Sequence, residues 1–349
     1  MLPMTLSASA PIRLSVVVPN YNHGALIGNA IRAFASQNRP PDEIVIVDDA
    51  STDDSRDRLQ RLSRELPSLR VIFLPENQGA IAALNHGLRS ARGHYVNFGA
   101  ADDVTHPGLF EAMLGALERH PAAAFACCEA MTLDLNTGET GYRPPVLPSF
   151  EEAYFSPYGA AGLLRRIDNL VLSGTAVARR DAVLAAGGLD PALRAFADGF
   201  LFRQLALQHG FCFAPGVGLT WRVSASGLSR SQAADLAGSL ETLQVAADRM
   251  HADPSFPRWY PELFERRWRF AVARLAAKET PMNGATLDRL ARGPIGRTIL
   301  KLATRVGGAA GRFSAMAWLT LQEQPTSLTG LVQTRHFRHN RINLARSKG

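Results

Sequence analysis

A pair of adjacent carboxylates stands where it could bind a cation. Three residues separate Asp102 and Asp103 from the predicted strand 94–98. Neighbouring acids are unfavourable unless a positive charge lies close to them. Mg²⁺ or Mn²⁺ meets that need, because such ions are typically held by one or two carboxylates together with phosphate oxygens and water. The alternative is that Asp103 caps a helix predicted over residues 109–119.

A second acidic group, Asp48, Asp49 and Asp53, follows the apolar segment 43–47. Side chains of this type also form turns and cap helices. A helix is predicted over residues 55–65, directly after the group. For Asp53 we favour this structural role alone.

Strands and helices alternate through the first hundred residues and must position these acids. Apolar, β-branched segments predict strands, and amphipathic segments between them predict helices. Such alternation indicates right-handed βαβ units and a parallel sheet, whose carboxyl edge is the usual place for a ligand. The predicted strands are residues 14–18, 43–47, 69–74 and 94–98, and the predicted helices are residues 25–37, 55–65 and 80–90.

The later sequence is less regular. Residues 134–162 are rich in Pro, Gly and aromatic side chains and are predicted to form an irregular connection that crosses the site. After residue 231 the pattern is helical to the end. Between these regions the sequence predicts strands at 169–178, 211–213 and 218–223, and helices at 179–186 and 200–208.

The chain has 349 residues and a formal net charge of +7, which is distributed unevenly. Residues 1–249 carry 21 Lys/Arg against 25 Asp/Glu, whereas residues 250–349 carry 17 against 6. Because the first part is net acidic and lacks interleaved basic and aromatic residues, we expect no nucleic-acid partner. Three cysteines give no disulfide framework, and neither a signal peptide nor a membrane-spanning run is visible, so a cytoplasmic location is expected.

Four motifs in order resemble the family 2 glycosyltransferases with the GT-A fold. They are VVVPNYN at 16–22, IVIVDDASTD at 44–53, NQG at 77–79 continuing to NHG at 85–87, and FGAADD at 98–103. The resemblance continues at 187–190 and at Asp198 and covers residues 12–230. It implies an α/β, Rossmann-like fold with a mostly parallel sheet flanked by helices, followed by a basic, mostly helical extension over 231–349.

The resemblance also implies a binding site for a nucleotide-sugar donor. Tyr21 offers an aromatic face for stacking, and Asp49 can accept a hydrogen bond from a uracil-type imide N–H. Arg222 suits a diphosphate, although packing over Trp221 is an alternative. The residues placed against the donor are Pro19, Asn20, Tyr21, Asp49, Asn77, Gly79, Asp102 and Arg222.

Two positions depart from the family pattern. Asp102 and Asp103 match the metal motif, which often reads Asp-x-Asp-Asp, but Ala100 stands where the first acid would be. Asp198 matches the general base of inverting members, and Ala197 precedes it where a Glu is common. A helix cap is the alternative for Asp198.

The activity that this resemblance implies is metal-dependent, inverting sugar transfer. The donor would be a nucleoside-diphosphate sugar, with UDP as the expected nucleotide, and the acceptor a saccharide or a lipid-linked saccharide. Cell-surface polysaccharide biosynthesis is the expected setting. The alternative is a degenerate relative that binds nucleotide sugar without turnover, which the alanines at 100 and 197 would explain.

The basic tail predicts an amphipathic helix over residues 291–319, interrupted near Gly307. Arg297, Lys301 and Arg305 recur every four residues on one face, and apolar residues recur on another. The apolar face could lie on an anionic membrane, peripherally at the inner face of the cell membrane, or it could pack on the catalytic domain. Periodicity does not separate the two. The apolar residues are Ile295, Ile299, Leu302, Val306, Phe313 and Met316.

Overall fold

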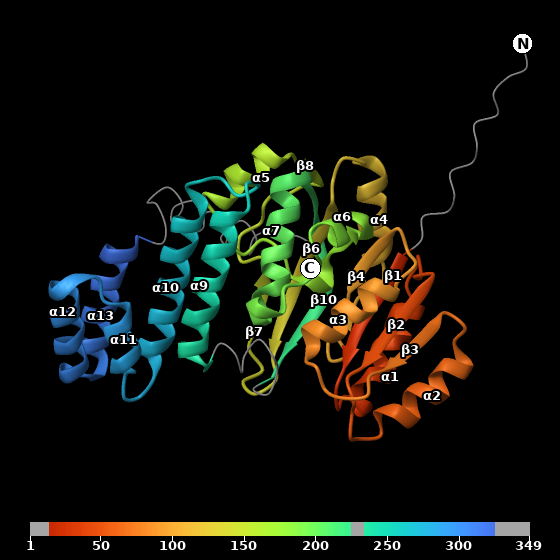
Figure 1. The fold of residues 1–349 in the computed structure, drawn as a ribbon, viewed down its shortest axis with the longest axis horizontal. Helices are drawn as coiled ribbons and strands as arrows, with labels where there is room; N and C mark the ends of the chain where they lie inside the picture. Colours follow the sequence, from red (N-terminus) through yellow and green to blue (C-terminus); the bar gives the residue numbers. More distant parts are fainter. Residues whose placement is uncertain (1–13, 225–233, 325–349) are drawn as a thin grey trace, which may run out of the picture.

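The structure, a computed structural model, describes residues 14–224 and 234–324 and is drawn in Figure 1. Its first half alternates strands with helices as the sequence predicts. The strands are β1 (Leu14–Asn20), β2 (Glu43–Asp48), β3 (Leu69–Phe73) and β4 (Tyr95–Phe98). The helices are α1 (Gly24–Ala35), α2 (Ser55–Glu65), α3 (Ala80–Ser90) and α4 (Leu109–Arg119).

The strands of the described residues form a mixed sheet. Its main path runs β3-β2-β1-β4-β9-β6-β10-β5, with β7 beside β6 and β8 beside β10. Pairs β1/β2, β1/β4, β2/β3 and β6/β10 are parallel, and the pairs made by β5, β7, β8 and β9 are antiparallel. The remaining strands are β5 (Val104–Thr105), β6 (Phe125–Asp134), β7 (Thr140–Arg143), β8 (Ala153–Phe155), β9 (Val177–Arg179) and β10 (Phe211–Val223).

Helices cover both faces of the sheet because successive strand residues point to opposite sides. Val16 and Val18 of β1 pack in a core with α1, α2 and α4, whereas Val17 packs in the core that contains α3 and α7 (Ala197–His209). All three valines are fully buried. This three-layer α/β arrangement confirms the predicted fold class.

The chain reverses its direction across the sheet at β1. From β1 the sheet continues to β2 and β3 on one side and to β4 on the other, with all four strands parallel. A crevice forms at such a switch point, outside the carboxyl ends of the strands. The loops after β1, β2 and β4 therefore meet at one place.

The region 134–162 differs from its prediction. It contains β7, β8 and most of α5 (Pro157–Leu164), and β6 ends at its first residue, so it is only partly irregular. Nor does any residue of 134–162 line the main cavity of the described chain. β10 replaces the two short strands expected near 211–223 and shifts register between Phe213 and Val217, where Pro215 and Gly216 interrupt the pairing.

The segment that was expected to be a strand over residues 169–178 contains a 3₁₀ turn, Ser173–Thr175, and only β9 as a strand. Next come α6 (Arg180–Ala185) and a second 3₁₀ segment, Pro191–Phe196. Gly187 and Gly188, between them, have φ values of 90° and 76°. These values lie in the left-handed region that favours glycine.

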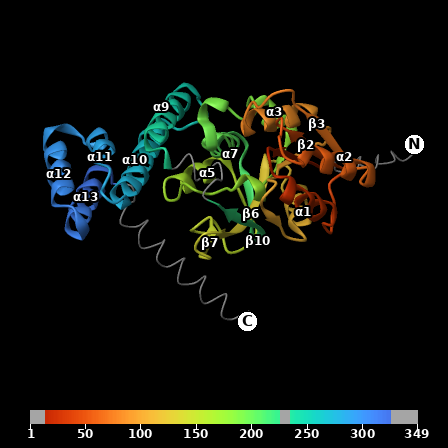
Figure 2. The ribbon, with the colours of Figure 1, turned by 90° about the horizontal axis from the view of Figure 1, so that it is seen from below.

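Helices alone follow residue 234 within the described chain. α9 and the start of α10 contribute Leu243, Met250 and Tyr260 to the core that contains α7. A separate core joins the rest of α10 to the last three helices, which lie at one end of the elongated molecule (Figures 1 and 2). The helices are α9 (Leu236–Ala252), α10 (Tyr260–Lys278), α11 (Gly284–Leu290), α12 (Gly293–Val306) and α13 (Gly308–Glu323).

The tail is interrupted at Gly307 as predicted. Of its six predicted apolar residues, Ile299 and Met316 are partly buried, and the other four are exposed. Ile295, Leu302, Val306 and Phe313 are 60–76% exposed. The helices bury other residues against each other, so the predicted apolar face does not pack on the catalytic domain. Throughout the described residues, no helix combines the length and apolar character needed to cross a membrane.

Candidate active site

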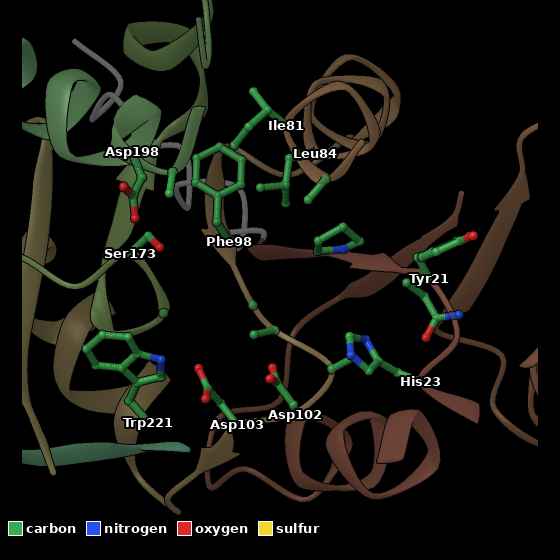
Figure 3. A pocket seen from close by; sticks show the side chains of 18 of the residues that line it. Tyr21, His23, Ile81, Leu84, Phe98, Asp102, Asp103, Ser173, Asp198 and Trp221 are labelled. Atoms are coloured by element: carbon green, nitrogen blue, oxygen red, sulfur yellow. The ribbon is translucent and has the colours of Figure 1, made fainter. Parts of the chain in front are cut away.

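A cavity of about 560 Å³ opens at the carboxyl ends of β1, β2, β4 and β10. Figure 3 shows side chains entering it from several of these loops and from α3 and α7. Every position predicted from the sequence to bind donor, metal or acceptor lines this cavity: Pro19, Asn20, Tyr21, Asp49, Asn77, Gly79, Asp102, Asp103, Asp198 and Arg222. The structure therefore brings together residues that are up to two hundred positions apart in the chain.

The loops after β1 and β2 are fastened to each other by side chains. The Asn20 amide donates to Asp48 Oδ2 at 2.8 Å and to Ser51 Oγ at 3.2 Å. Asn22, with a positive φ of 56°, accepts from the Thr52 backbone N–H at 2.8 Å. The amide nitrogen of Asn20 is therefore committed to the protein, and its side chain acts here in holding the loops.

Asp53 has the structural role predicted for it. Its carboxylate accepts hydrogen bonds from the backbone N–H groups of Gly24 at 2.9 Å and Ser55 at 3.0 Å. These bonds lower the pKa of Asp53 below its ordinary value despite some desolvation. The side chain thus fastens the starts of α1 and α2.

Asp49 holds the loop before α3. Its two carboxylate oxygens accept from the backbone N–H groups of Gln78 and Gly79, each at 2.8 Å, and the residue is only 2% exposed. Gly79 has φ of 88°, a conformation that glycine adopts without strain. Since each carboxylate oxygen has a second lone pair, Asp49 can still accept a hydrogen bond from a ligand.

Tyr21, Asn77 and His23 edge the cavity. Tyr21 is 44% exposed and Asn77 is exposed, so both are available to a ligand at the rim. His23, which the sequence analysis did not select, lies on the same side as Asp102 in Figure 3. Its Nδ1 is buried without a hydrogen-bond partner among the described residues.

Asp102 and Asp103 point into the same part of the cavity (Figure 3). Asp103 does not cap α4, whose cap position is Gly108; its Oδ1 instead accepts from the Arg222 backbone N–H at 3.0 Å. Burial and the charge of Asp102 raise the pKa of Asp103 to about 7, against the opposing effect of the Arg222 backbone and guanidinium. The end of β10 thereby fixes one of the two acids and places a cation beside it.

This pair fits a divalent cation that shares its coordination with a ligand. Within residues 14–224 and 234–324 there is no cluster of three or more His, Cys, Asp or Glu suited to holding a metal. Two carboxylates that repel each other would be stabilised by a cation, and phosphate oxygens and water can complete an octahedral set. The protein supplies only part of such a site.

Asp198 lies in the first turn of α7, after the cap position Phe196, so it is not the helix cap that its spacing also allowed. Burial raises the pKa of its carboxyl group, and hydrogen bonds from the Ser173 hydroxyl and the Gly199 backbone N–H, with the charge of Arg203, oppose the rise. Figure 3 shows Asp198 and Ser173 side by side, across the cavity from the acid pair.

A largely buried polar network supports the helix that carries Asp198. Arg203 donates through Nη1 to the Gly199 carbonyl at 2.6 Å and through Nη2 to Asp168 Oδ1 at 3.0 Å. Tyr260 of α10 donates to the same Asp168 oxygen at 2.6 Å. Asp168 and Tyr260 raise the pKa of Arg203 despite its burial, so the guanidinium stays charged.

Sequence reasoning missed several cavity residues. Ser173 lay within an apolar stretch predicted to be a strand, and only the dipeptide Ser173-Gly174 indicated a turn there. Ile81 and Leu84 of α3, with Phe98 of β4, give the upper wall an apolar surface (Figure 3). They fall within the predicted helix 80–90 and the predicted strand 94–98, and no role in the site was predicted for their side chains.

Comparison with known proteins gives a family match over just under half of the chain. Residues 15–185 match the model of "Glycosyl transferase family 2". The chain is 36% identical to the putative teichuronic acid biosynthesis glycosyltransferase TuaG of Bacillus subtilis over 122 residues. This aligned stretch covers 35% of this chain and 48% of TuaG. Over 118 residues it is 31% identical to a GalNAc(5)-diNAcBac-PP-undecaprenol beta-1,3-glucosyltransferase of Campylobacter jejuni, covering 33% and 38% of the two chains.

Solved structures share the fold at low sequence identity. Residues 1–349 of S. aureus TarS in complex with UDP-GlcNAc superpose with a TM-score of 0.60 at 16% identity, covering 90% of this chain and 93% of that one. The mannosyltransferase PcManGT of Pyrobaculum calidifontis in complex with GDP-Man and Mn²⁺ gives 0.56 at 20% identity, covering 89% and 86%. The curated relatives, in contrast, are matched over about half of their length or less.

Proposed function

We propose that this chain, whose residues 15–185 belong to glycosyl transferase family 2, transfers a sugar from a nucleoside-diphosphate sugar to a saccharide acceptor. The observation that carries the proposal is the cavity itself. Asp198 faces it from α7, and the pair Asp102 and Asp103 faces it from the loop after β4. Sugar transfer needs these two functions, a base for the acceptor and a site for the diphosphate.

The donor we propose is a UDP-sugar held at the carboxyl ends of β1 and β2. The cavity volume of about 560 Å³ suits a ligand of that size. Tyr21 would stack on the uracil base. Asp49 would accept a hydrogen bond from the imide N–H of the base, using the lone pairs that are not taken by the backbone N–H groups of Gln78 and Gly79. TarS, which shares the fold, was solved with UDP-GlcNAc.

Asp102 and Asp103 would hold Mg²⁺ or Mn²⁺ together with oxygens of the donor diphosphate. When bound, the cation would stabilise the negative charge that develops on the departing nucleoside diphosphate. Arg222, which already lowers the pKa of Asp103 from the end of β10, would stabilise the same diphosphate charge with its guanidinium. PcManGT, with the same fold, was solved with Mn²⁺.

Asp198 would act as the general base. The acceptor hydroxyl oxygen attacks the anomeric carbon, its proton passes to the Asp198 carboxylate, and the bond from that carbon to the diphosphate oxygen breaks with its electron pair leaving on the diphosphate. Because Asp198 lies across the cavity from the acid pair, attack comes from the face opposite the leaving group. One displacement of this kind inverts the anomeric configuration.

The acceptor we propose is a saccharide or a lipid-linked saccharide in cell-surface glycan assembly, at the inner face of the cell membrane. One of the curated relatives carries teichuronic acid biosynthesis in its name, and another acts on an undecaprenol-linked glycan according to its name. The apolar wall of Ile81, Leu84 and Phe98 offers a surface on which a sugar ring can pack. The helices after residue 230 are proposed as an extension of the GT-A domain of residues 12–230.

The competing function is binding of nucleotide sugar without turnover. Ala100 and Ala197 favour it, because acids common in the family are absent there. The two functions are separated by measuring UDP release from UDP-sugars with Mn²⁺, with and without saccharide acceptors, alongside donor binding by calorimetry. Binding without turnover in the unaltered chain would favour the competing function.

Asp198→Asn is the variant that tests the base. We expect it to lower turnover about a hundredfold or more, the range for loss of a general base, and to leave the donor dissociation constant nearly unchanged. Asp181→Asn, an exposed acid in the first turn of α6, is the matched control and should keep full turnover. Turnover of Asp198→Asn at the level of this control would overturn the assignment.

A further inference from the structure

Helix α12 carries a row of exposed apolar side chains. Ile295, Leu302 and Val306 are 67%, 60% and 61% exposed, and their spacing of seven and four residues places them on one face of the helix. We call these three residues the apolar row. On the neighbouring helix α13, Phe313 and Leu321 are also 76% and 70% exposed.

The apolar row is separate from the surface by which α12 packs. That helix buries Gly296, Leu300 and Ala303. Gly296 lies so close to Trp318 of α13 that an added Cβ would be 3.1 Å from its indole nitrogen, and Gly311 of α13 meets the backbone of Ala303. The hairpin of α12 and α13 is therefore already closely packed, and the row faces away from it.

The surroundings of the row are cationic. α12 contains Arg297, Lys301 and Arg305 and no acidic residue. Arg297 and Lys301 share one partner, Asp288, at 3.5 and 3.7 Å, and all three side chains are more than a third exposed. Exposed pairs of this type are weak. Residues 284–324 carry six Lys/Arg against two Asp/Glu, and one of the two acids, Glu323, is fully buried.

We propose that the apolar row and its flanking cations dock on the surface of an anionic lipid bilayer. An exposed apolar row beside basic residues is the combination that binds such a surface, through insertion of the apolar side chains and attraction to acidic headgroups. A second copy of the chain is disfavoured as the occupant, because it would bring the same positive charge to the contact. Residues 325–349 are disfavoured for the same reason, since they carry five Lys/Arg and no Asp/Glu.

The docking surface lies at the opposite end of the molecule from β2 and β3 (Figure 1). It is distinct from the cavity, and docking does not depend on the proposed transfer reaction. For an enzyme with a lipid-linked acceptor, docking would confine the cavity to the neighbourhood of the membrane.

Co-sedimentation of the full chain with vesicles tests the proposal. One set of vesicles is phosphatidylcholine, and the other is an equimolar mixture of phosphatidylcholine and phosphatidylglycerol. We expect binding to the mixed vesicles that weakens with added salt. The triple variant Ile295→Ser, Leu302→Ser, Val306→Ser should bind at least about tenfold more weakly than the unaltered chain, because it loses the inserting side chains.

Charge is tested by a second variant with a matched control. Lys301→Gln with Arg305→Gln should weaken binding to the mixed vesicles about tenfold, since each basic residue near an anionic surface contributes to attraction. Arg61→Gln with Arg64→Gln makes the same charge change on α2, at the other end of the molecule, and should bind like the unaltered chain. Thermal unfolding and donor binding of each variant report whether the fold is retained.

Three outcomes would overturn the proposal. One is absence of binding to the mixed vesicles at low salt. Another is equal loss of binding in the α12 and α2 charge variants, which would assign binding to net charge alone. The third is that the triple serine variant binds vesicles like the unaltered chain but sediments more slowly than it in the absence of vesicles. That result would mean that the apolar row joins copies of the chain.

Discussion

Tyr260, the first residue of α10, donates a hydrogen bond of 2.6 Å to Asp168, and it does so inside the core that also contains α7. Arg203 of α7 donates to the same carboxylate oxygen at 3.0 Å. The helical extension is thus joined through one carboxylate to the helix that carries Asp198. A network of buried polar groups of this kind stabilises strongly only while every member has its partners.

Removal of this network should cost both stability and turnover. Tyr260→Phe deletes two hydrogen bonds, the one donated to Asp168 and the one that Arg203 Nε donates to the hydroxyl at 2.9 Å, and should lower the free energy of unfolding by about 2 kcal/mol. Arg203→Met should lower it by about 3–5 kcal/mol, because Asp168 would lose its main buried partner. Both variants should lower kcat and change KM less. The reason is that Arg203 also holds the Gly199 carbonyl next to Asp198, so its loss disturbs the position of the proposed base. Chemical denaturation and steady-state kinetics measure the two effects.

Arg266→Met is the control for the arginine variant. Arg266 pairs with Glu262 one turn away on α10, and the acid is 68% exposed. Exposed pairs of this spacing contribute about 0.5 kcal/mol or less. Equal destabilisation by Arg203→Met and Arg266→Met would show that the Asp168 network has no special role.

The buried charge of Asp198 should make the protein less stable than its neutral variant at neutral pH. Burial raises the pKa of Asp198 in the folded state above its unfolded value. Below the unfolded pKa the group is protonated in both states and has no effect; as pH rises through the folded pKa, the cost of the buried charge becomes complete. Asp198→Asn should therefore gain stability relative to the parent chain with rising pH.

The measurement is the difference in melting temperature between the parent chain and Asp198→Asn across acid to neutral pH. Asp181→Asn, at an exposed position, should show a flat difference over the same range. A difference for Asp198→Asn that shrinks as pH rises would contradict the assigned direction of the pKa shift.

The regular half of the fold could be predicted because its signals are local. Helices α2, α3 and α4 begin and end at the predicted residues, since their apolar periodicity and the turn residues between them are visible within a short window. The loops that carry Asp49 and Asp102 were likewise predictable, because parallel strands end at one edge of a sheet.

What could not be predicted depends on distant pairing. β6 pairs with β9 and β10, which follow it by some fifty to ninety residues along the chain, and its own sequence carries no strong alternation. The contact of Ser173 with Asp198 depends on this second half of the sheet. In the tail, periodicity identified the apolar face of α12 but not its neighbour, and the structure leaves that face exposed.

Loss of the Ser173 hydroxyl should shift the pH dependence of turnover. Its hydrogen bond to Asp198 favours the ionised carboxylate, which is the form that acts as base. Ser173→Ala should raise the pKa of Asp198 further and move the acidic limb of the kcat profile to higher pH, because the carboxylate loses a hydrogen bond that favours its ionised form. Turnover should recover at alkaline pH.

Ser156→Ala provides a serine control away from the cavity. Ser156 caps α5 by accepting from the Gly159 backbone N–H at 3.2 Å, so its loss should cost stability of about 1 kcal/mol without moving the pH profile. Lower turnover of Ser173→Ala at every pH, with an unshifted limb, would mean that the hydroxyl does not act through Asp198.

Restoring the missing acid of the metal motif should tighten cation binding. Ala100 lines the cavity two residues before Asp102 and is only partly buried, so a carboxylate at this position can face the cation without entering the core. In Ala100→Asp the cation gains a third acidic neighbour, and each hard carboxylate ligand favours Mg²⁺ or Mn²⁺. We expect half-maximal activation at about tenfold lower Mn²⁺ than in the parent chain, roughly 1.4 kcal/mol of binding free energy. Without cation the third acid should raise the pKa of Asp103 further, because like charges disfavour ionisation.

Titration of UDP release with Mn²⁺ after treatment with EDTA measures this effect. Ala100→Asn is the matched control, because asparagine is close in size to aspartate but uncharged. It should require the same Mn²⁺ concentration as the parent chain. Asp102→Asn should require more Mn²⁺ than either, because one of the two native ligands is lost. If Ala100→Asp and Ala100→Asn respond alike, the carboxylate does not reach the cation, and the pair formed by Asp102 and Asp103 would be the whole acidic contribution of the protein to that site.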